Sequence, residues 1–410
     1  MKLVVLIGAC YNIFVALGFP FAIGALYLEI LDTFNSTRGE TSLVPAFCLG
    51  CTFGVGFLSG FFIQRCGMKT VMVAGGLVSS LGLFTSWFAQ SVVHLIVTVG
   101  VINGFGNSFI FISITKLVAG TFNKSRSQSL VLSGIMFSGG IGTILFPYIL
   151  ATLNSVYGWR GTFLLISCFY LQTIVSTLVI TSSLGNPQLF KGQRPTGHVT
   201  GKESKSKWKL MLKPVFVSFV ITSCLSFGTA NNIGGILSDL AKSKGFSEER
   251  GLALILYYNS FNTIARLLSG ILKLIPRLHS IIIFTLSAAL LGISLIFLGA
   301  STEWSMLTVL TSTAGAGIGG MTTMLAVVSL EVLSQEMLPF GLGLCGMING
   351  AVTSVFGTVI GLVFDNRKSY QVPLYVFGSI AVGAAALTMM VFISLECRCN
   401  KKHVRSMIRL

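Results

Sequence analysis

Charged residues are scarce in this chain of 410 residues. Only 10% of the residues are Asp, Glu, Lys or Arg, whereas 53% are hydrophobic. A soluble domain carries about 25% charged residues, so this scarcity excludes an ordinary soluble protein. Apolar segments of about 20 residues or more, long enough to cross roughly 30 Å of hydrocarbon, recur along the whole length. The sequence therefore predicts an integral membrane protein that crosses the bilayer many times.

The sequence also lacks the residue sets that catalysis needs. It has 12 acids and 4 histidines, and all of them fall in loops or near the ends of apolar segments. We find no nucleophile beside a base, no cluster of metal ligands and no phosphate-binding loop. The 9 cysteines form no disulfide framework. We therefore expect neither an enzyme nor a bound cofactor or metal.

Twelve apolar segments are predicted to be transmembrane helices, so we expect an all-α membrane protein. They lie at about 3–31, 42–63, 70–90, 92–119, 129–156, 162–184, 214–238, 251–272, 280–300, 305–333, 340–364 and 373–395. The first ten residues also fit a short signal peptide, but the apolar run continues unbroken to Leu31. We expect it to be retained as the first span.

One long polar segment, residues 185–213, is rich in Gly, Pro, Ser and Lys. This composition is typical of a flexible linker. It divides the chain into an N-terminal six-helix half (1–184) and a C-terminal six-helix half (214–395), which is followed by a short tail (396–410).

The net charge of +16 follows from membrane topology rather than from nucleic-acid binding. If both termini and the linker are cytoplasmic, the cytoplasmic side holds most of the 28 Lys and Arg residues. This is the distribution that the positive-inside rule requires. Asn35 starts a glycosylation sequon on the outer side, and Cys397 and Cys399, just below the last span, are candidates for palmitoylation.

The turn between the second and third spans carries a recognisable motif. Gly60, Gln64, Arg65, Gly67 and Lys69 resemble the G-x-x-x-D-R-x-G-x-K/R signature of the major facilitator superfamily, in which two six-helix halves flank a cytoplasmic linker. The glycines allow a tight turn, and the two cations can hold helix ends or carboxylates. Glutamine replaces the usual aspartate, which weakens any charge latch.

Further pieces resemble the monocarboxylate transporter family within that superfamily, and the likeness runs through nearly the whole chain. They are Pro20, residues 121–126 with Lys124 and Arg126, the YGWRGTFLL stretch at 157–165, and the pattern that ends at Arg266. The resemblance implies a divergent member that works by alternating access in the plasma membrane, with its solute site between the halves. It also implies a single-span ancillary glycoprotein as a partner.

Arg266 is the only formal charge that we place well inside a predicted span. Asn259, Asn262 and Arg266 lie at i, i+3 and i+7, and Tyr258 is one turn before Asn262, so the four form a polar stripe on one helix face. An intramembrane charge is costly and usually marks a functional site. Snorkelling of Arg266 toward the cytoplasmic interface is the alternative, but it leaves the rest of the stripe unexplained. We expect Arg266 to grip a carboxylate through two parallel hydrogen bonds.

Two positions depart from the proton-coupled members of the family. The resemblance places an Asp where this chain has Asn262, and a Lys after the proline where it has Phe21. Neither side chain can take up a proton near neutral pH. We therefore expect a facilitative carrier of a small organic carboxylate or amino-acid-like solute, with Phe21 in its site. The alternatives are a carrier of a neutral or otherwise coupled solute, and a transporter-like sensor that moves nothing.

Other amides in the predicted spans are Asn103 and Asn107, which share a face of the fourth span, Asn231 and Asn232 in the seventh, and Asn349 in the eleventh. Such groups usually form hydrogen bonds between helices rather than ligand contacts, and we expect that role here.

Overall fold

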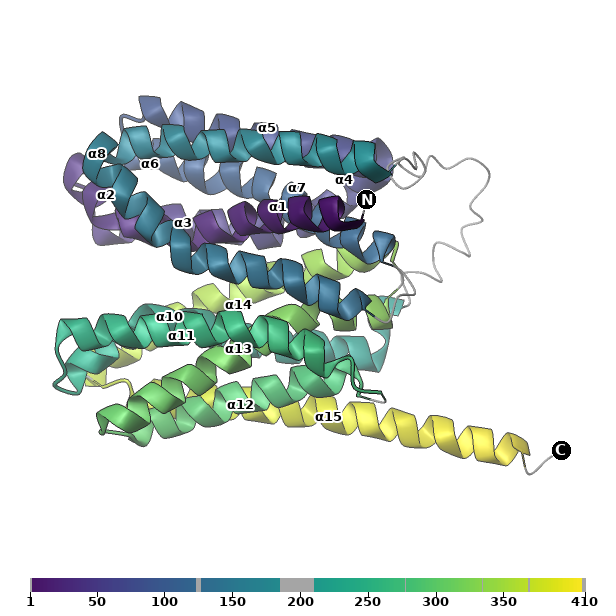
Figure 1. The fold of residues 1–410 in the computed structure, drawn as a ribbon. Helices are drawn as coiled ribbons and strands as arrows, with labels where there is room; N and C mark the ends of the chain where they lie inside the picture. The colour runs from purple at the N-terminus through teal and green to yellow at the C-terminus, as the bar shows by residue number, and fades with distance from the viewer. Residues whose placement is uncertain are drawn as a thin grey trace. The chain divides into compact units, whose positions relative to one another are not determined.

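The structure, a computed structural model, describes residues 2–122, 127–184, 210–276, 278–333, 335–367 and 369–407, and these residues are almost entirely helical (Figure 1). The helices are α1 (Lys2–Ala22), α2 (Tyr27–Phe34), α3 (Arg38–Gly54), α4 (Gly56–Cys66), α5 (Met68–Thr85), α6 (Val92–Leu95), α7 (Asn103–Thr121), α8 (Gln128–Leu184), α10 (Pro214–Ser243), α11 (Glu248–Leu272), α12 (Ser280–Ala300), α13 (Trp304–Val332), α14 (Leu338–Arg367) and α15 (Gln371–Met407). Lys124, Arg126 and most of the predicted linker lie outside the described residues.

The helices account for the twelve predicted spans. Among the described residues, 9 helices are long and apolar enough to cross a membrane. The helices α3 and α4, bent by 47° at their junction, pass the same test only together, and the count is 10 if the pair is one broken span. The 57 residues of α8 would extend about 86 Å at 1.5 Å per residue, far more than one bilayer thickness. Gly158, with φ 64° and ψ 174°, breaks α8 into two arms, which Figure 1 shows. The remaining long helix, α11, occupies the position of the predicted eighth span. These helices confirm the predicted all-α membrane fold.

The chain divides into two compact units. Unit 1 comprises Met1–Val199, Arg266–Leu274 and Ser334–Ala351, and unit 2 comprises Thr200–Ala265, Ile275–Leu333 and Val352–Leu410. The end of α11 and the beginning of α14 thus belong to unit 1, although the sequence assigns both helices to the C-terminal half. In unit 1, α1 packs mainly against α8, and α5 packs against α7 and α8. In unit 2, α12 packs against α13 and α15.

Pro20 marks the point at which the first span changes its helical form. Pro20 is buried near the end of α1, which gives way after Ala22 to a 3₁₀ helix, Ile23–Leu26. Proline has no N–H to donate and its ring crowds the preceding turn, so an α-helix is weakened there. The first span therefore continues into α2 through a tighter turn.

The YGWRG motif fastens the break in α8 to two other elements of unit 1. The indole N–H of Trp159 donates to the Thr33 hydroxyl at 3.1 Å. The guanidinium of Arg160 lies 4.3 Å from the centre of the Trp159 ring and donates to the Ala89 carbonyl at 3.0 Å. These contacts join the α8 break to α2 and to the segment that follows α5, so the motif has a structural role.

Candidate functional site

The predicted polar stripe lies on the inner face of α11. Tyr258 and Arg266 are each 4% exposed, and Asn262 is 7% exposed. The opposite face carries large exposed apolar side chains, namely Leu256, Phe261, Ile264 and Leu268. A membrane helix places its apolar face toward lipid and its polar groups toward protein, so the sequence pattern and the burial agree on the orientation of α11.

Glycines of α13 bring its main chain against the stripe. A Cβ atom on Gly315 would lie 3.0 Å from the carbonyl carbon of Tyr258, and one on Gly319 would lie 2.9 Å from that of Asn262. Both neighbours are backbone atoms, which cannot rotate away. The two helices therefore meet backbone to backbone at successive turns, as small residues permit in membranes.

The guanidinium of Arg266 is held by α8. Its Nη1 donates to the main-chain carbonyl of Met136 at 3.0 Å, and one turn further on Gly270 packs closely against Ser133 of the same helix. The Met136 carbonyl is a neutral acceptor, so this bond orients the guanidinium without cancelling its charge. A buried head group that bonds to a neighbouring helix does not fit snorkelling. Because the acceptor is a main-chain atom, no side-chain pattern in the sequence could reveal it.

The other predicted site residues have diverse surroundings. The hydroxyl of Tyr258 donates to the Ala230 carbonyl of α10 at 2.9 Å, which ties it to the packing of unit 2. Asn259 is partly exposed one position further on. Phe21 lies on α1 of unit 1 and is 42% exposed, and its ring is 6.4 Å from the ring of Phe53. Phe53 in turn lies 5.8 Å from Phe111, so Phe21 ends a short row of aromatic rings.

The motif between the second and third spans forms the tight turn that the sequence predicts, with Gly67 at φ 88°. A Cβ on Gly60 would lie 3.1 Å from that of Pro339, so this glycine packs on the start of α14. Arg65 is exposed and covers the ring of Phe61 at 4.5 Å, and Lys69 is also exposed. Among the described residues neither cation meets a carboxylate, and a partner for them stays a prediction.

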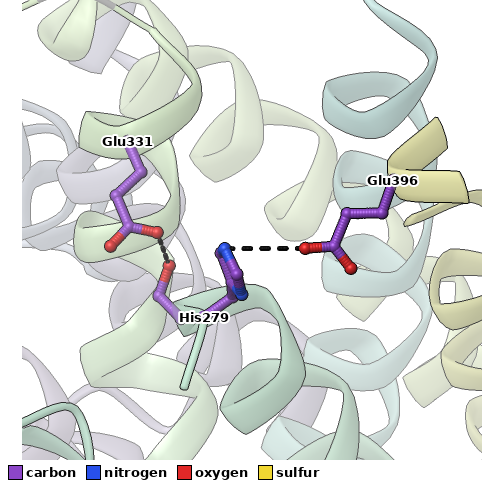
Figure 2. Close-up of polar contacts among 4 residues, drawn as sticks. His279, Glu331 and Glu396 are labelled. Atoms are coloured by element: carbon purple, nitrogen blue, oxygen red, sulfur yellow. Dashed lines mark hydrogen bonds and ion pairs between the residues drawn. The ribbon is translucent and has the colours of Figure 1, made fainter. Parts of the chain in front are cut away.

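Three titratable side chains of unit 2, His279, Glu331 and Glu396, lie near one another (Figure 2). Glu331, in the last turn of α13, accepts a hydrogen bond from the Ser280 hydroxyl at the start of α12. The Nε2 atom of His279 lies 3.8 Å from Oε1 of Glu396 on α15, and both side chains are about half exposed. His279 and Glu331 lie at helix ends, and Glu396 lies at the end of the apolar part of α15, so all three avoid the centres of the spans, as the sequence predicts.

Comparison with known proteins places this architecture in a family. The model of the Major Facilitator Superfamily matches residues 8–303. Monocarboxylate transporter 3 of Rattus norvegicus is 25% identical over 97% of this chain and 81% of its own length, and monocarboxylate transporter 6 of Mus musculus is 22% identical over 96% and 87%. Monocarboxylate transporter 14 of Homo sapiens is 35% identical, but over only 36% of this chain and 29% of its own.

Two solved structures share the fold. The proton:xylose symporter XylE, bound to 6-bromo-6-deoxy-D-glucose, has a TM-score of 0.71 at 15% identity and covers 95% of each chain. FucP in its outward conformation has a TM-score of 0.71 at 12% identity, covering 94% of this chain and 98% of its own. At such identities the likeness concerns the fold alone. In sequence, the chain resembles the monocarboxylate transporters over nearly its whole length. The match of the family model to residues 8–303 shows that the chain belongs to the major facilitator superfamily of membrane transporters.

Proposed function

We propose that the protein carries a small organic carboxylate across the membrane by alternating access, and that Arg266 binds the carboxylate. The observation that carries this proposal is a buried guanidinium on the polar face of α11, oriented by the Met136 carbonyl. A guanidinium stays charged at any physiological pH and matches a carboxylate with two parallel hydrogen bonds. The names of the relatives, monocarboxylate transporters, point to the same solute class.

The amides of the stripe complete the proposed site. Asn262 lies one turn before Arg266 on the same face, and Asn259 is partly exposed one further turn away. Amide N–H₂ groups donate hydrogen bonds to carboxylate or hydroxyl oxygens without adding charge. A site with one cation and neutral donors is suited to a solute with a single negative charge.

Transport in this proposal follows the gradient of the solute and is not coupled to protons. A proton symporter needs a group near the solute whose pKa is crossed during the cycle. Position 262 is an amide and position 21 is a phenyl ring, while Glu331 and His279 lie at helix ends and Glu396 lies at the end of the apolar part of α15. Facilitative transport is therefore the mode that these residues support.

The test is uptake of radiolabelled monocarboxylates and amino-acid-like solutes by the Arg266→Lys variant in oocytes or proteoliposomes. Lysine keeps the charge but loses the planar fork, and a charge-assisted hydrogen bond contributes about 1.5–3 kcal/mol, so KM should rise by at least about tenfold. Arg250→Lys is the matched control, because Arg250 is an exposed arginine at the start of the same helix. Normal uptake by Arg266→Lys at normal surface expression would refute the assignment.

We propose also that both termini are cytoplasmic and that the protein resides in the plasma membrane. The excess of Lys and Arg in the loops assigned to the cytoplasmic side supports this orientation. Tags at Thr200 and after Leu410 should bind antibody only after the cells are permeabilised, and labelling of intact cells would contradict it. Co-purification from the same cells would test for the ancillary glycoprotein that the family resemblance implies.

A further inference from the structure

Two adjacent amides of α10, Asn231 and Asn232, have different surroundings in unit 2. Asn232 Nδ2 donates to the Gly228 carbonyl at 2.7 Å and to the Thr353 carbonyl of α14 at 2.8 Å, so it joins two helices as the sequence predicts. Asn231 is exposed. Its Nδ2 lies 3.5 Å from the Thr353 hydroxyl, longer than an ordinary hydrogen bond, and its Oδ1 accepts none within the described residues. The amide of Asn231 is therefore largely unused.

The side of α10 that carries Asn231 points away from α15. Thr222 lies nine residues earlier, and this spacing is about two and a half turns at 3.6 residues per turn, which places two side chains on opposite faces. The Thr222 hydroxyl donates to the Ala384 carbonyl of α15 at 2.7 Å. The helix α15 itself exposes large apolar side chains, among them Leu387 and Met390, as a helix in contact with lipid does. Asn231 thus lies on the side of α10 opposite to this lipid-facing helix.

The helices α11 and α14 flank the same side of α10. On one flank, the Tyr258 hydroxyl of α11 donates to the Ala230 carbonyl at 2.9 Å. On the other, a Cβ on Gly228 would lie 2.7 Å from a methyl group of Val352 on α14. Asn231 lies between these two contacts. An exposed amide with unused hydrogen-bonding groups is strongly disfavoured in lipid, so its exposure at this place indicates contact with water.

The exposure of α10 changes at Asn231. Residues 222–230 are buried except Leu225, which is partly exposed. Beyond Asn231, Ser238 is partly exposed and Lys242 is exposed, and both lie on the Asn231 face because they follow at helical spacing. The helix is therefore enclosed before Asn231 and open from Asn231 toward the loop that follows α10. Asn231 forms the bottom of this open face.

We propose that Asn231 contacts the transported solute and selects one with a neutral hydroxyl or amide group remote from its carboxylate, an inference that rests on the proposed function. A side-chain amide offers both a donor and an acceptor, so it can pair with such a group without adding charge. Tyr258, which bonds to the residue before Asn231, lies eight residues before Arg266, about 12 Å along α11 at 1.5 Å per residue. Aromatic or long-chain hydroxy acids and amino acids fit this separation better than short-chain acids do.

Reaction of a cysteine at position 231 tests whether the face contacts water. In broken membranes, where a reagent reaches both sides, Asn231→Cys in a background without other cysteines should react with a charged methanethiosulfonate. Lys242→Cys should react as well, whereas Thr222→Cys, on the opposite buried face, should not. The reaction requires a thiolate, which is disfavoured in apolar surroundings. An unreactive cysteine at position 231 beside a reactive one at 242 would overturn the inference and leave the role of Arg266 standing.

Solute preference in the protein with its natural cysteines gives a second measurement. The unmodified protein should take up 4-hydroxyphenylacetate in preference to phenylacetate. Asn231→Leu should lower the ratio of the two uptake rates by about fivefold, the contribution of one neutral hydrogen bond. This ratio does not depend on how much protein reaches the membrane. Asn232→Leu is the matched control, because it removes the bonds to α14 and should lower the melting temperature without changing the ratio.

The outcomes separate this inference from the proposed function. An unchanged ratio in Asn231→Leu, or uptake of short-chain acids only by the unmodified protein, would overturn the inference while the proposed function stands. The absence of uptake of any carboxylate by the unmodified protein would overturn both.

Discussion

Replacing Gly343 with alanine should force the beginning of α14 away from the junction of α3 and α4. In unit 1, a Cβ on Gly343 would lie 2.7 Å from the Phe57 Cα, and the other two nearest atoms also belong to the backbone of Gly56 and Phe57. Ordinary van der Waals contact begins at 3.4 Å. No side chain can rotate to relieve the overlap, so the two helices must separate by about 1 Å.

The expected cost follows from this overlap. Adding a methyl group to a closely packed contact typically costs about 1–3 kcal/mol. In a transporter that alternates between conformations, this free-energy cost applies only to the conformations in which α14 touches the junction of α3 and α4. Their population should therefore drop by about 5- to 150-fold relative to arrangements in which the helices are apart.

Crosslinking measures the separation directly. The rings of Phe57 and Phe340 are 5.2 Å apart, so cysteines at these positions, in a background without other cysteines, should react efficiently with a short bifunctional reagent. Gly343→Ala should reduce the crosslinked fraction and change the rate of uptake. Gly350→Ala is the matched control on the same helix, because a Cβ there meets nothing within 4 Å. Equal crosslinking in the two variants would refute the reasoning.

Three further outcomes are expected. Uptake should change little between about pH 6 and pH 8, because Asn262 holds no proton, whereas Asn262→Asp should make it pH-dependent; strong acid stimulation of the unmodified protein would contradict this. Arg160→Gln removes the hydrogen bond to the segment after α5 and the contact with Trp159. Thermal unfolding in detergent should therefore show that the free energy of unfolding falls by about 1–3 kcal/mol. An unchanged melting curve would count against the structural role of the YGWRG motif. Lys244→Met removes the ammonium that donates to the Leu298 carbonyl at the end of α12 at 2.8 Å. The same assay should show that the free energy of unfolding falls by about 1 kcal/mol. An unchanged free energy of unfolding would mean that water replaces the ammonium.

The sequence predicts well the features that depend on whether each residue faces lipid, water or protein. The spans follow from the length of apolar runs, and the orientation of α11 follows from the spacing of Asn262 and Arg266, because the bilayer separates polar from apolar faces. The interhelical role expected for Asn103 is also confirmed by its bond to the Ser79 carbonyl.

Features that depend on main-chain geometry could not be predicted in this way. The acceptor for Arg266 is the carbonyl of Met136, an atom that every residue has. The π-helical turn before Asn103 arises where α5 and α7 meet, and its residues, Ile, Val, Thr and Gly, would suit an ordinary helix equally well. Arg65, expected to meet a carboxylate or a helix end, covers the ring of Phe61, a choice that only the folded arrangement decides.

The contact of Gly315 and Gly319 with the backbone of α11 has a consequence for inherited variation in this protein. Because no side chains intervene, the placement of the stripe depends on two residues that carry no functional group. A variant with alanine or serine at either glycine would displace Arg266 together with its whole helix. In an uptake assay such a variant would behave like one with reduced affinity for the solute. A clinical or evolutionary survey that scores only polar residues would overlook this variant.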